Sequence, residues 1–505
     1  MSHRPLATPA LTSLTGSGAP GPHMPEEEPA RLSDRRFLTL LVGTSTLILF
    51  LASMLRHALH QSNLFDLGIF DQALYLLSRG LPPISTTMGF HILGDHSAFI
   101  LYPLSVLYAI FPHVGWLFFV QALSLSLSAI PIFRIALHTG LSHAWARTLA
   151  LSTLLYPSLF NTNLFDFHPE VIALPALLWG CWAALTGRSA PLIVAVLIAL
   201  SCKEVVSLTV LTMGAWLFLI GKKSYGMLLA GMGATWFVVS TRLVIPAFSG
   251  SGPAAMQRYP YLGETMGEMV RNVMLHPELI LGRIFSPEAL GYYLLLLCPL
   301  LIALHLKEWK AVVPALPMLL LNVLAVNQTQ RDLIHQYSLL IFPFLLIAAA
   351  HSIKRLDGKR RWLSPRVLTA WSLVAFLALA KVGYFGSLYL SHLSNRDSAL
   401  RAIALIDDQG SVLTTSNLAA QLSQRPVIEM TIEARGVDAI LAPAYDHILL
   451  DLRHPAWPSS VEFAVALRDR LLASPAYTLT FQENEVILFQ AAQEHRKKQK
   501  ASPAQ

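Results

Sequence analysis

Charged residues are scarce in this chain. Asp, Glu, Lys and Arg make up 13% of its 505 residues, whereas a typical soluble protein carries about 25%. Hydrophobic residues reach 54%, and the mean hydropathy is +0.52. These values exclude an ordinary soluble domain and indicate a protein with many membrane-spanning helices.

Cysteine is also rare, and the 3 cysteines lie in apolar segments without CxxC spacing: Cys181, Cys202 and Cys298. Neither a disulfide framework nor a zinc ribbon is therefore indicated. The net charge of +7 comes from basic residues that lie between apolar runs rather than in one stripe. That distribution follows membrane topology and argues against nucleic acid as a partner.

Apolar runs define the expected architecture, because a helix needs about 20 such residues to cross a bilayer. We predict an all-α membrane domain over residues 37–392 with about eleven spans. The predicted spans are 37–55, 116–137, 146–161, 170–187, 189–202, 204–221, 226–246, 289–306, 310–326, 333–352 and 366–390. The run 98–112 is short and broken by proline, so we expect a re-entrant or juxtamembrane helix within the first external loop, 56–115.

The basic residues give the expected orientation in the cytoplasmic membrane. Three arginines before the first span place the N-terminus in the cytoplasm: Arg31, Arg35 and Arg36. Later basic turns, such as KRLDGKRR, then also lie inside, and the C-terminal residues lie outside. Residues 1–36 are expected to form a disordered cytoplasmic arm, because their upstream part is rich in Pro, Gly, Ser and Thr, and residues 493–505 a disordered basic tail.

The tetrapeptide NLFD occurs twice, at 63–66 and 163–166, and this orientation places both copies outside. Other polar residues gather on the same face. Acids there could act as a general base or bind a metal, and the basic groups could hold a phosphate. The candidates are Asp66, Asp71, His91, Asp95, His96, Asp166, His168, Glu170, Lys203, Glu204, Arg258, Arg331, Asp332 and His335.

Structural roles compete with chemical ones in the first of these stretches. Asp66 or Asn63 could N-cap the helix that follows. Asp66 and Asp71 are five residues apart, which is about 140° on one helix. We therefore expect one of the two to face the site and the other to cap or pair.

The remaining acids and bases have structural alternatives too. Glu170 is near a helix N-terminus, where an acid is favoured. Lys203 and Glu204 could be only an ion pair, since a charge at the membrane centre costs about 2.5–3.5 kcal/mol. They are expected to face a wet cavity or each other. Arg331 and Asp332 could likewise pair at the surface.

A family resemblance runs over about residues 37–490. FDLGIFDQALY, LGDHSAFILYPLSVLYAIFP, LYPSLFNTNLFDFHPEVIALP and a KE pair follow in the order found in domain-of-unknown-function family 2079, a group of predicted prokaryotic membrane proteins. The layout also resembles the wider GT-C glycosyltransferases, which move a sugar from a polyprenyl-phosphate carrier to an acceptor at the outer membrane face. Unlike them, the first loop has no Asp-Glu or Asp-X-Asp pair at Asp66.

The GT-C resemblance implies roles for the candidates. Asp66 would be the catalytic acid/base or would orient the acceptor, which is a glycan, lipid or protein. Asp166, with His168 or Glu170, would be the second acidic site, which in some members binds a divalent metal such as Mg²⁺ or Mn²⁺. Positive groups would stabilise the departing phosphate: Lys203, Arg258 and Arg331.

Residues 395–492 differ in composition and predict a small extracytoplasmic α/β domain. SVLTTS and DHILLDL are expected strands, RDSALRAIALIDD and SSVEFAVALRDRLL expected helices, and YTLTFQENEVILFQ a hairpin with Asn484 near its turn. The segment lacks GxGxxG and GxxxxGK[ST], which argues against nucleotide binding. Acceptor recognition or covering of the site is its expected purpose.

Two other functions compete with the transferase. A lipid or polysaccharide transporter or flippase predicts inverted repeats and charges near the bilayer midplane. Here a tetrapeptide is repeated without a repeated span pattern, and the charges gather at one face. A non-catalytic GT-C-like scaffold is the third alternative.

Overall fold

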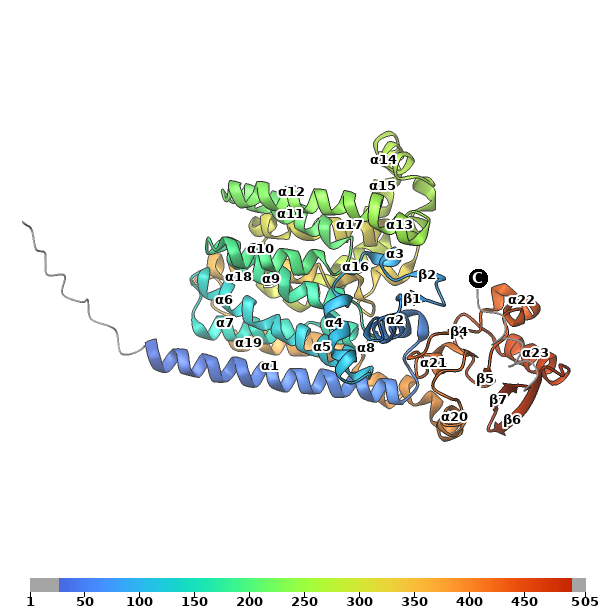
Figure 1. Ribbon diagram of the computed structural model, residues 1–505. Coiled ribbons are helices and arrows are strands. Elements are labelled where there is room, and N and C mark those ends of the chain that lie inside the picture. The colour runs from blue at the N-terminus through green and yellow to red at the C-terminus, as the bar shows by residue number, and fades with distance from the viewer. Residues whose placement is uncertain (1–26, 493–505) are drawn as a thin grey trace, which may run out of the picture.

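The computed structural model describes residues 27–492 as a bundle of helices with a small sheet at one end (Figure 1). Helix α1 (Glu27–Ala58) runs along one side of the bundle. It begins upstream of the predicted first span, so residues 27–36 are helical rather than part of an irregular arm. The cause lies partly in Asp34, which is buried and bonds to Arg147 and His143. The rest of the expected arm and the tail 493–505 lie outside the described residues.

The first loop folds into short elements between α1 and the next long helix. They are η1 (Leu64–Gly68), α2 (Ile69–Ser78), β1 (Ile84–Ser85), β2 (Phe90–His91), α3 (Leu93–His96) and α4 (Leu101–Ile110). Helix α4 has 10 residues and is therefore about 15 Å long, half of the hydrocarbon thickness. The prediction of a short helix in the run 98–112 is confirmed, and its re-entrant or juxtamembrane position stays a prediction.

Helices form the body of the bundle. Its first half comprises α5 (Gly115–Leu127), α6 (Ala129–His138), α7 (His143–Leu154), α8 (Pro157–Leu164), α9 (Glu170–Leu185), α10 (Ser189–Leu200), α11 (Val206–Leu219), α12 (Lys223–Val239), η2 (Ser240–Val244) and α13 (Ile245–Ser249). Its second half comprises η3 (Ala254–Arg258), η4 (Pro260–Leu262), α14 (Met266–Leu275), α15 (Pro277–Ile284), α16 (Pro287–Leu297), η5 (Cys298–Ala303), η6 (Leu306–Ala315), α17 (Leu316–Leu324), η7 (Gln328–Arg331), η8 (Gln336–Ser338), α18 (Phe342–Leu356), α19 (Pro365–Leu379), η9 (Lys381–Gly386) and η10 (Leu388–Ser394).

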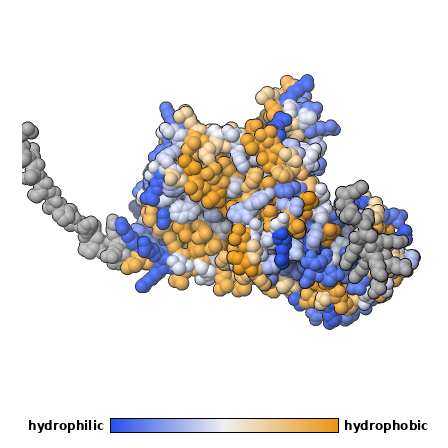
Figure 2. Space-filling model, in the orientation of Figure 1, coloured by the Kyte–Doolittle hydropathy of each residue, from blue (hydrophilic) through white to orange (hydrophobic). Residues whose placement is uncertain are grey.

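Several of these helices are long and apolar enough to cross a membrane. Within residues 27–492 there are 4 by length and composition, or up to 6 if each of two bent pairs is one span. The 4 are Arg31–Ala58, Gly115–His138, Lys223–Ser249 and Gln336–Leu356. Orange apolar side chains cover much of the visible bundle surface, while blue polar ones gather towards its ends (Figure 2). Helices occupy each predicted span, and the total of about eleven stays a prediction.

The C-terminal layer contains the expected strands and helices. A five-stranded sheet has the order β4 (Ile428–Met430), β3 (Val412–Thr414), β5 (His447–Asp451), β7 (Val486–Ala491) and β6 (Tyr477–Glu483). Strand β3 is parallel to β4 and β5, and β7 is antiparallel to β5 and β6. The hairpin turns at Asn484 and Glu485, both with positive φ, as the sequence predicts for Asn484. The elements are α20 (Arg396–Ile403), β3 (Val412–Thr414), α21 (Ser416–Ala419), β4 (Ile428–Met430), η11 (Glu433–Arg435), α22 (Val437–Leu441), β5 (His447–Asp451), α23 (Val461–Leu472), β6 (Tyr477–Glu483) and β7 (Val486–Ala491).

The sheet layer is docked directly on the first loop. Leu64, from the first NLFD copy, is fully buried in the apolar core of the C-terminal layer. The Thr86 hydroxyl donates to the Ile428 carbonyl at 2.6 Å, and the Ile428 amide donates back to it at 3.1 Å. The Gln72 amide donates to the Arg425 carbonyl at 3.3 Å. Strand β4 is an edge of the sheet, so the first loop covers an edge that would otherwise be open.

Candidate functional site

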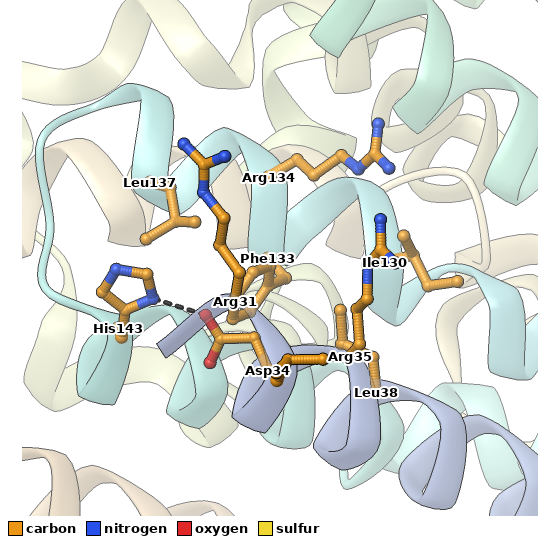
Figure 3. Close-up of a pocket in the computed structure, with 10 residues that line it drawn as sticks. Arg31, Asp34, Arg35, Leu38, Ile130, Phe133, Arg134, Leu137 and His143 are labelled. Atoms are coloured by element: carbon orange, nitrogen blue, oxygen red, sulfur yellow. Dashed lines mark hydrogen bonds and ion pairs between the residues drawn. The ribbon is translucent and has the colours of Figure 1, made fainter. Parts of the chain in front are cut away.

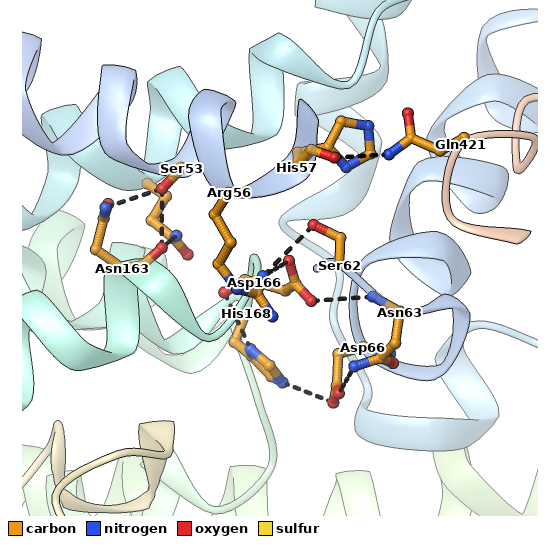
Figure 4. Close-up of polar contacts among 11 residues, drawn as sticks. Ser53, Arg56, His57, Ser62, Asn63, Asp66, Asn163, Asp166, His168 and Gln421 are labelled. Atoms are coloured by element: carbon orange, nitrogen blue, oxygen red, sulfur yellow. Dashed lines mark hydrogen bonds and ion pairs between the residues drawn. The ribbon is translucent and has the colours of Figure 1, made fainter. Parts of the chain in front are cut away.

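The two NLFD copies meet at one end of the bundle (Figure 4). The backbone amide of Asn63 donates to the Asp166 carboxylate at 3.3 Å. The other asparagine, Asn163, ties its own segment to α1: its amide donates to the Leu49 carbonyl and to Ser53, each at 2.8 Å. Residues about 100 positions apart in the chain thus form one polar cluster, as the orientation of the predicted spans implied.

Asn63 shapes the turn that presents Asp66. Its side-chain oxygen accepts from the Asp66 amide at 2.8 Å, and its side-chain nitrogen donates to the Asp66 carboxylate at 2.7 Å. This is the N-cap of η1, a single π-helical turn of a kind that occurs often at functional sites. Asn63 therefore takes the capping role, and Asp66 remains available to the site.

Asp66 is the more accessible acid of the pair. Its side chain is 23% exposed, and one oxygen lies 3.6 Å from Nε2 of His168. Burial by itself would raise the pKa of Asp66, but the hydrogen bond and charge of His168 and the hydrogen bond from Asn63 leave this pKa lowered. The His168 ring stacks on Phe165, with centroids 5.5 Å apart, which fixes its direction. Asp66 is thus a carboxylate that stays ionised at neutral pH.

Asp166 is enclosed instead. Its side chain is 0% exposed and forms an ion pair with Arg56, which comes from the last turn of α1. Burial raises the pKa of Asp166, and the charge of Arg56 opposes that shift. The backbone at Asp166 has a φ of 83°, a left-handed conformation that Asp tolerates better than most residues. Asp166 therefore fixes the two loops relative to α1.

Asp71 faces away from this cluster, as the spacing from Asp66 predicts. One carboxylate oxygen accepts from Tyr108 at 2.6 Å, and the other accepts from Ser423 at 2.6 Å in the C-terminal layer. Burial raises the pKa of Asp71, opposed by the hydrogen bonds from Ser423, Tyr108 and Gln424. Asp71 also lines a cavity of about 500 Å³ between the bundle and the sheet layer. It is the pairing residue of the two.

A second polar cluster adjoins the first. The Lys203 ammonium lies 2.6 Å from Glu170, and His96 lies 3.3 Å from both Asp95 and Glu204. One oxygen of Glu170 is buried without a hydrogen-bond partner among the described residues. Lys203 and Glu204 therefore pair with other residues rather than only with each other.

His96, Glu170, Lys203 and Glu204 of this second cluster line a small cavity of about 70 Å³ together with Arg258, Tyr259 and Gln330, and we name it the polar cavity after these side chains. Beside it lies a cavity of about 260 Å³ with almost wholly apolar walls, which shares Glu204, Val205 and Tyr259 with the polar one. A charged chamber thus borders an apolar one, as a phosphate with a hydrocarbon tail requires. Asp66, His168, Glu170 and Lys203 link the two clusters, because the charge of His168 acts on Glu170.

The residues that the resemblance assigned to a metal do not fit one. Asp166 is already paired with Arg56, Glu170 is already paired with Lys203, and His168 faces Asp66. In the described part of the chain, no group of three or more His, Cys, Asp or Glu side chains is arranged to hold a metal ion. The cationic partners already balance the carboxylates, so we derive no step through a metal.

Two further candidates, Arg331 and His91, lie apart from these clusters, whereas His335 packs on Phe165 of the second NLFD copy with ring centroids 4.3 Å apart. Arg331 donates to the backbone carbonyls of Val323 and Ala325 and does not line the polar cavity, so its guanidinium supports a turn. His91 stacks on Phe248, with ring centroids 4.4 Å apart. His335 bonds to Asp332 at 2.8 Å, so Asp332 pairs with this histidine instead of Arg331.

Sequence reasoning missed Arg56 and Tyr108, which hold the two buried aspartates. Arg56 has a visible signal: it is a charge at the end of an apolar run, directly before an acidic loop. Tyr108 has none, since a tyrosine in an apolar helix is ordinary. Ser423 could not be found either, because 352 residues separate it from Asp71.

The family model described as "Predicted membrane protein (DUF2079)" matches residues 56–488. The chain belongs to this family. No curated protein matches the DUF2079 chain significantly. Among solved structures, it is similar to ArnT from Cupriavidus metallidurans bound to undecaprenyl phosphate, with TM-score 0.53 and 13% identity over 91% of this chain and 99% of that one. The apo ArnT structure gives TM-score 0.49 and 12% identity over 90% and 98%.

The likeness to ArnT covers nearly the whole of both chains, and at 13% identity it shows the fold alone. The DUF2079 chain therefore has an ArnT-like membrane fold, and the predicted resemblance to the DUF2079 family is confirmed.

Proposed function

We propose that this protein is a membrane glycosyltransferase that moves a sugar from a polyprenyl-phosphate donor to an acceptor. The supporting observation is the charged chamber of Lys203, Glu170 and Arg258 that borders an apolar cavity and connects through His168 to the accessible Asp66. The ArnT structure that shares the fold was solved with undecaprenyl phosphate, a lipid phosphate.

In the proposed reaction, Asp66 is the base. The acceptor hydroxyl gives its proton to the Asp66 carboxylate while its oxygen forms a bond to the anomeric carbon of the donor sugar. The bond from that carbon to the phosphate oxygen breaks, and the electron pair leaves with polyprenyl phosphate. Displacement from the opposite face inverts the anomeric configuration.

Positive side chains favour this departure. Lys203 and Arg258 line the polar cavity and would attract the phosphate as its charge grows, a large contribution in such sites. Glu170 holds the Lys203 ammonium in place, so the pair is prepared before the donor binds. Arg56 and Asp166 act as positioning residues that fix the loop bearing Asp66.

The proposed setting is the cytoplasmic membrane, with the N-terminus inside and the clusters and sheet layer at the outer face. The sheet layer would then cover the acceptor side of the site. The apolar cavity, lined by Leu208, Phe237 and Met269 among others, would receive the isoprenoid tail. The acceptor would be a glycan, a lipid or a protein.

The test uses the purified full-length protein in nanodiscs with a panel of polyprenyl-phosphate sugars, and the product is polyprenyl phosphate. Asp66→Asn should lower turnover at least about 100-fold. Asp397→Asn is the matched control, because the Asp397 side chain is 82% exposed and its ion pair is with Arg396, outside both clusters. Loss of turnover in both variants, or in neither, contradicts the assignment of Asp66. If no donor is consumed and labelled lipid or glycan crosses the membrane of proteoliposomes, the protein is a transporter or flippase. If neither donor consumption nor transport occurs, the protein is a scaffold.

A further inference from the structure

A cavity of about 640 Å³ lies at the other end of the bundle, between α1 and α6 (Figure 3). Arg31 and Arg35 line it from α1, and Arg134 lines it from α6. Helix rise places Arg31 about 38 Å along α1 from Arg56 and hence from the candidate site. That distance exceeds the hydrocarbon thickness of about 30 Å, so the two sites lie at opposite membrane faces.

The charges around this cavity are mostly positive. Asp34 is the acid among its described lining residues, and it is already bonded to Arg147 and to His143. The guanidinium of Arg134 lies 4.9 Å from the ring centroid of Trp179 and 5.0 Å from that of Trp182. Aromatic faces hold this arginine beside the cavity without neutralising it. The chamber therefore favours an anion.

The walls between the arginines are apolar. Four apolar side chains line the cavity: Leu38, Ile130, Phe133 and Leu137. Helix direction places Leu38 and Ile130 about one turn further into the bundle than Arg35 and Arg134. Along α1 the apolar character continues into side chains that face outward, such as Leu40, which is 69% exposed. A small anion such as free phosphate would use the arginines and leave these walls unoccupied. An amphipathic anion would use both.

We propose that this cavity binds an anionic phospholipid, with its phosphate between Arg35 and Arg134 and its first acyl carbons against Leu38 and Ile130. Basic pockets between helices at a membrane surface recognise such headgroups. The site is distinct from the donor site by position, and it lies in the membrane leaflet at the α1 N-terminus.

The experiment titrates the full-length protein in neutral detergent with a fluorescent phosphatidylglycerol, and phosphatidylcholine serves as the zwitterionic comparison. Phosphatidylglycerol should bind more tightly. The exchanges Arg35→Gln and Arg134→Gln should each weaken it about fivefold, which corresponds to about 1 kcal/mol per arginine. The matched control pair is the single variants Arg36→Gln and Arg366→Gln. Each removes one positive charge from an exposed residue outside the cavity.

Three outcomes would overturn the proposal. Equal binding of the two lipids removes the need for an anionic headgroup. Equal weakening by the control pair shows attraction to net charge rather than to this cavity. Displacement of the lipid by millimolar inorganic phosphate assigns the arginines to free phosphate instead. The Asp66→Asn variant should bind phosphatidylglycerol normally, so this result is independent of the proposed transferase activity.

Discussion

The two NLFD copies have the same four residues and opposite environments. In the first copy, the asparagine caps its own turn and leaves Asp66 partly exposed beside His168. In the second, the asparagine is tied to α1 and Asp166 is enclosed with Arg56. The difference comes from the local segment: the first copy caps and begins η1 in the first loop, and the second copy ends α8 inside the bundle. A repeated motif therefore marks a contact surface, and the environment decides which copy is reactive.

Asp66 and Asp166 should differ most in catalysis. In one turnover assay, Asp66→Asn should lower kcat at least about 100-fold without a change in the unfolding temperature. Asp166→Asn should retain more activity, because its carboxylate is fully enclosed and paired with Arg56. A larger kcat loss in Asp166→Asn with an unchanged unfolding temperature would invert the comparison.

For stability, the Asp166 environment should matter more than that of Asp66. Arg56→Met leaves the Asp166 charge buried without its cation, and breaking a buried pair costs about 3–5 kcal/mol. Thermal unfolding followed by tryptophan fluorescence should therefore fall sharply for Arg56→Met. The double variant with Asp166→Asn removes both charges, keeps a side chain that tolerates the left-handed backbone, and should recover much of the loss. No recovery would show that Arg56 acts through other contacts.

His168→Phe sharpens the distinction between the two carboxylates. The exchange keeps a ring against Phe165 and removes the nitrogen near Asp66, so the pKa of Asp66 should rise. A base works above its pKa and is lost as pH falls through it. The acid limb of the pH–kcat profile should therefore move to higher pH in the variant. An unmoved limb with lower kcat would instead indicate a purely steric role for His168.

Asp71 should influence the docking of the sheet layer in a pH-dependent way. Burial raises its pKa in the folded protein, so the folded state keeps this proton at a pH where the unfolded chain has lost it. That contribution is present at acid pH and decreases as pH rises through the folded pKa. Asp71→Asn should flatten this dependence, measured by protease sensitivity of the C-terminal layer across pH. A slope equal to that of the wild type would assign the dependence to other groups.

Metal removal should have the smallest effect. Since Arg56 and Lys203 already neutralise the acids of the second loop, a chelator should change turnover by less than about twofold. If the chelator abolished turnover and added Mg²⁺ or Mn²⁺ restored it, the two ion pairs would have to open during turnover.

The sequence predicted the features that depend on local pattern. Apolar runs located the helices, the proline-broken run 98–112 gave a short helix, and alternating residues located the hairpin at Asn484. The spacing of Asp66 and Asp71 predicted that they would face different ways. Each of these follows from the geometry of one helix or one turn.

The sequence did not predict which residues pair over long distances in the chain. Glu170 begins α9 as expected, but its partner Lys203 comes from the turn between α10 and α11. Arg331 was assigned to a phosphate, and the structure adds its bonds to the carbonyls of Val323 and Ala325 near the end of α17. Which cation reaches which acid depends on how the helices pack, and hydropathy carries no information about that.

The buried position of Leu64 in the C-terminal layer has a consequence for biosynthesis. The contact from Gln72 to Arg425 joins residues 353 positions apart, and the second partner is made near the end of the chain. At about 5–20 residues per second, the ribosome needs about 20–70 s to cover that interval. Throughout this time, the loop with Asp66 lacks the layer that encloses Leu64. The newly inserted helices therefore wait in the membrane with an unfinished site, and activity begins only when translation is nearly complete.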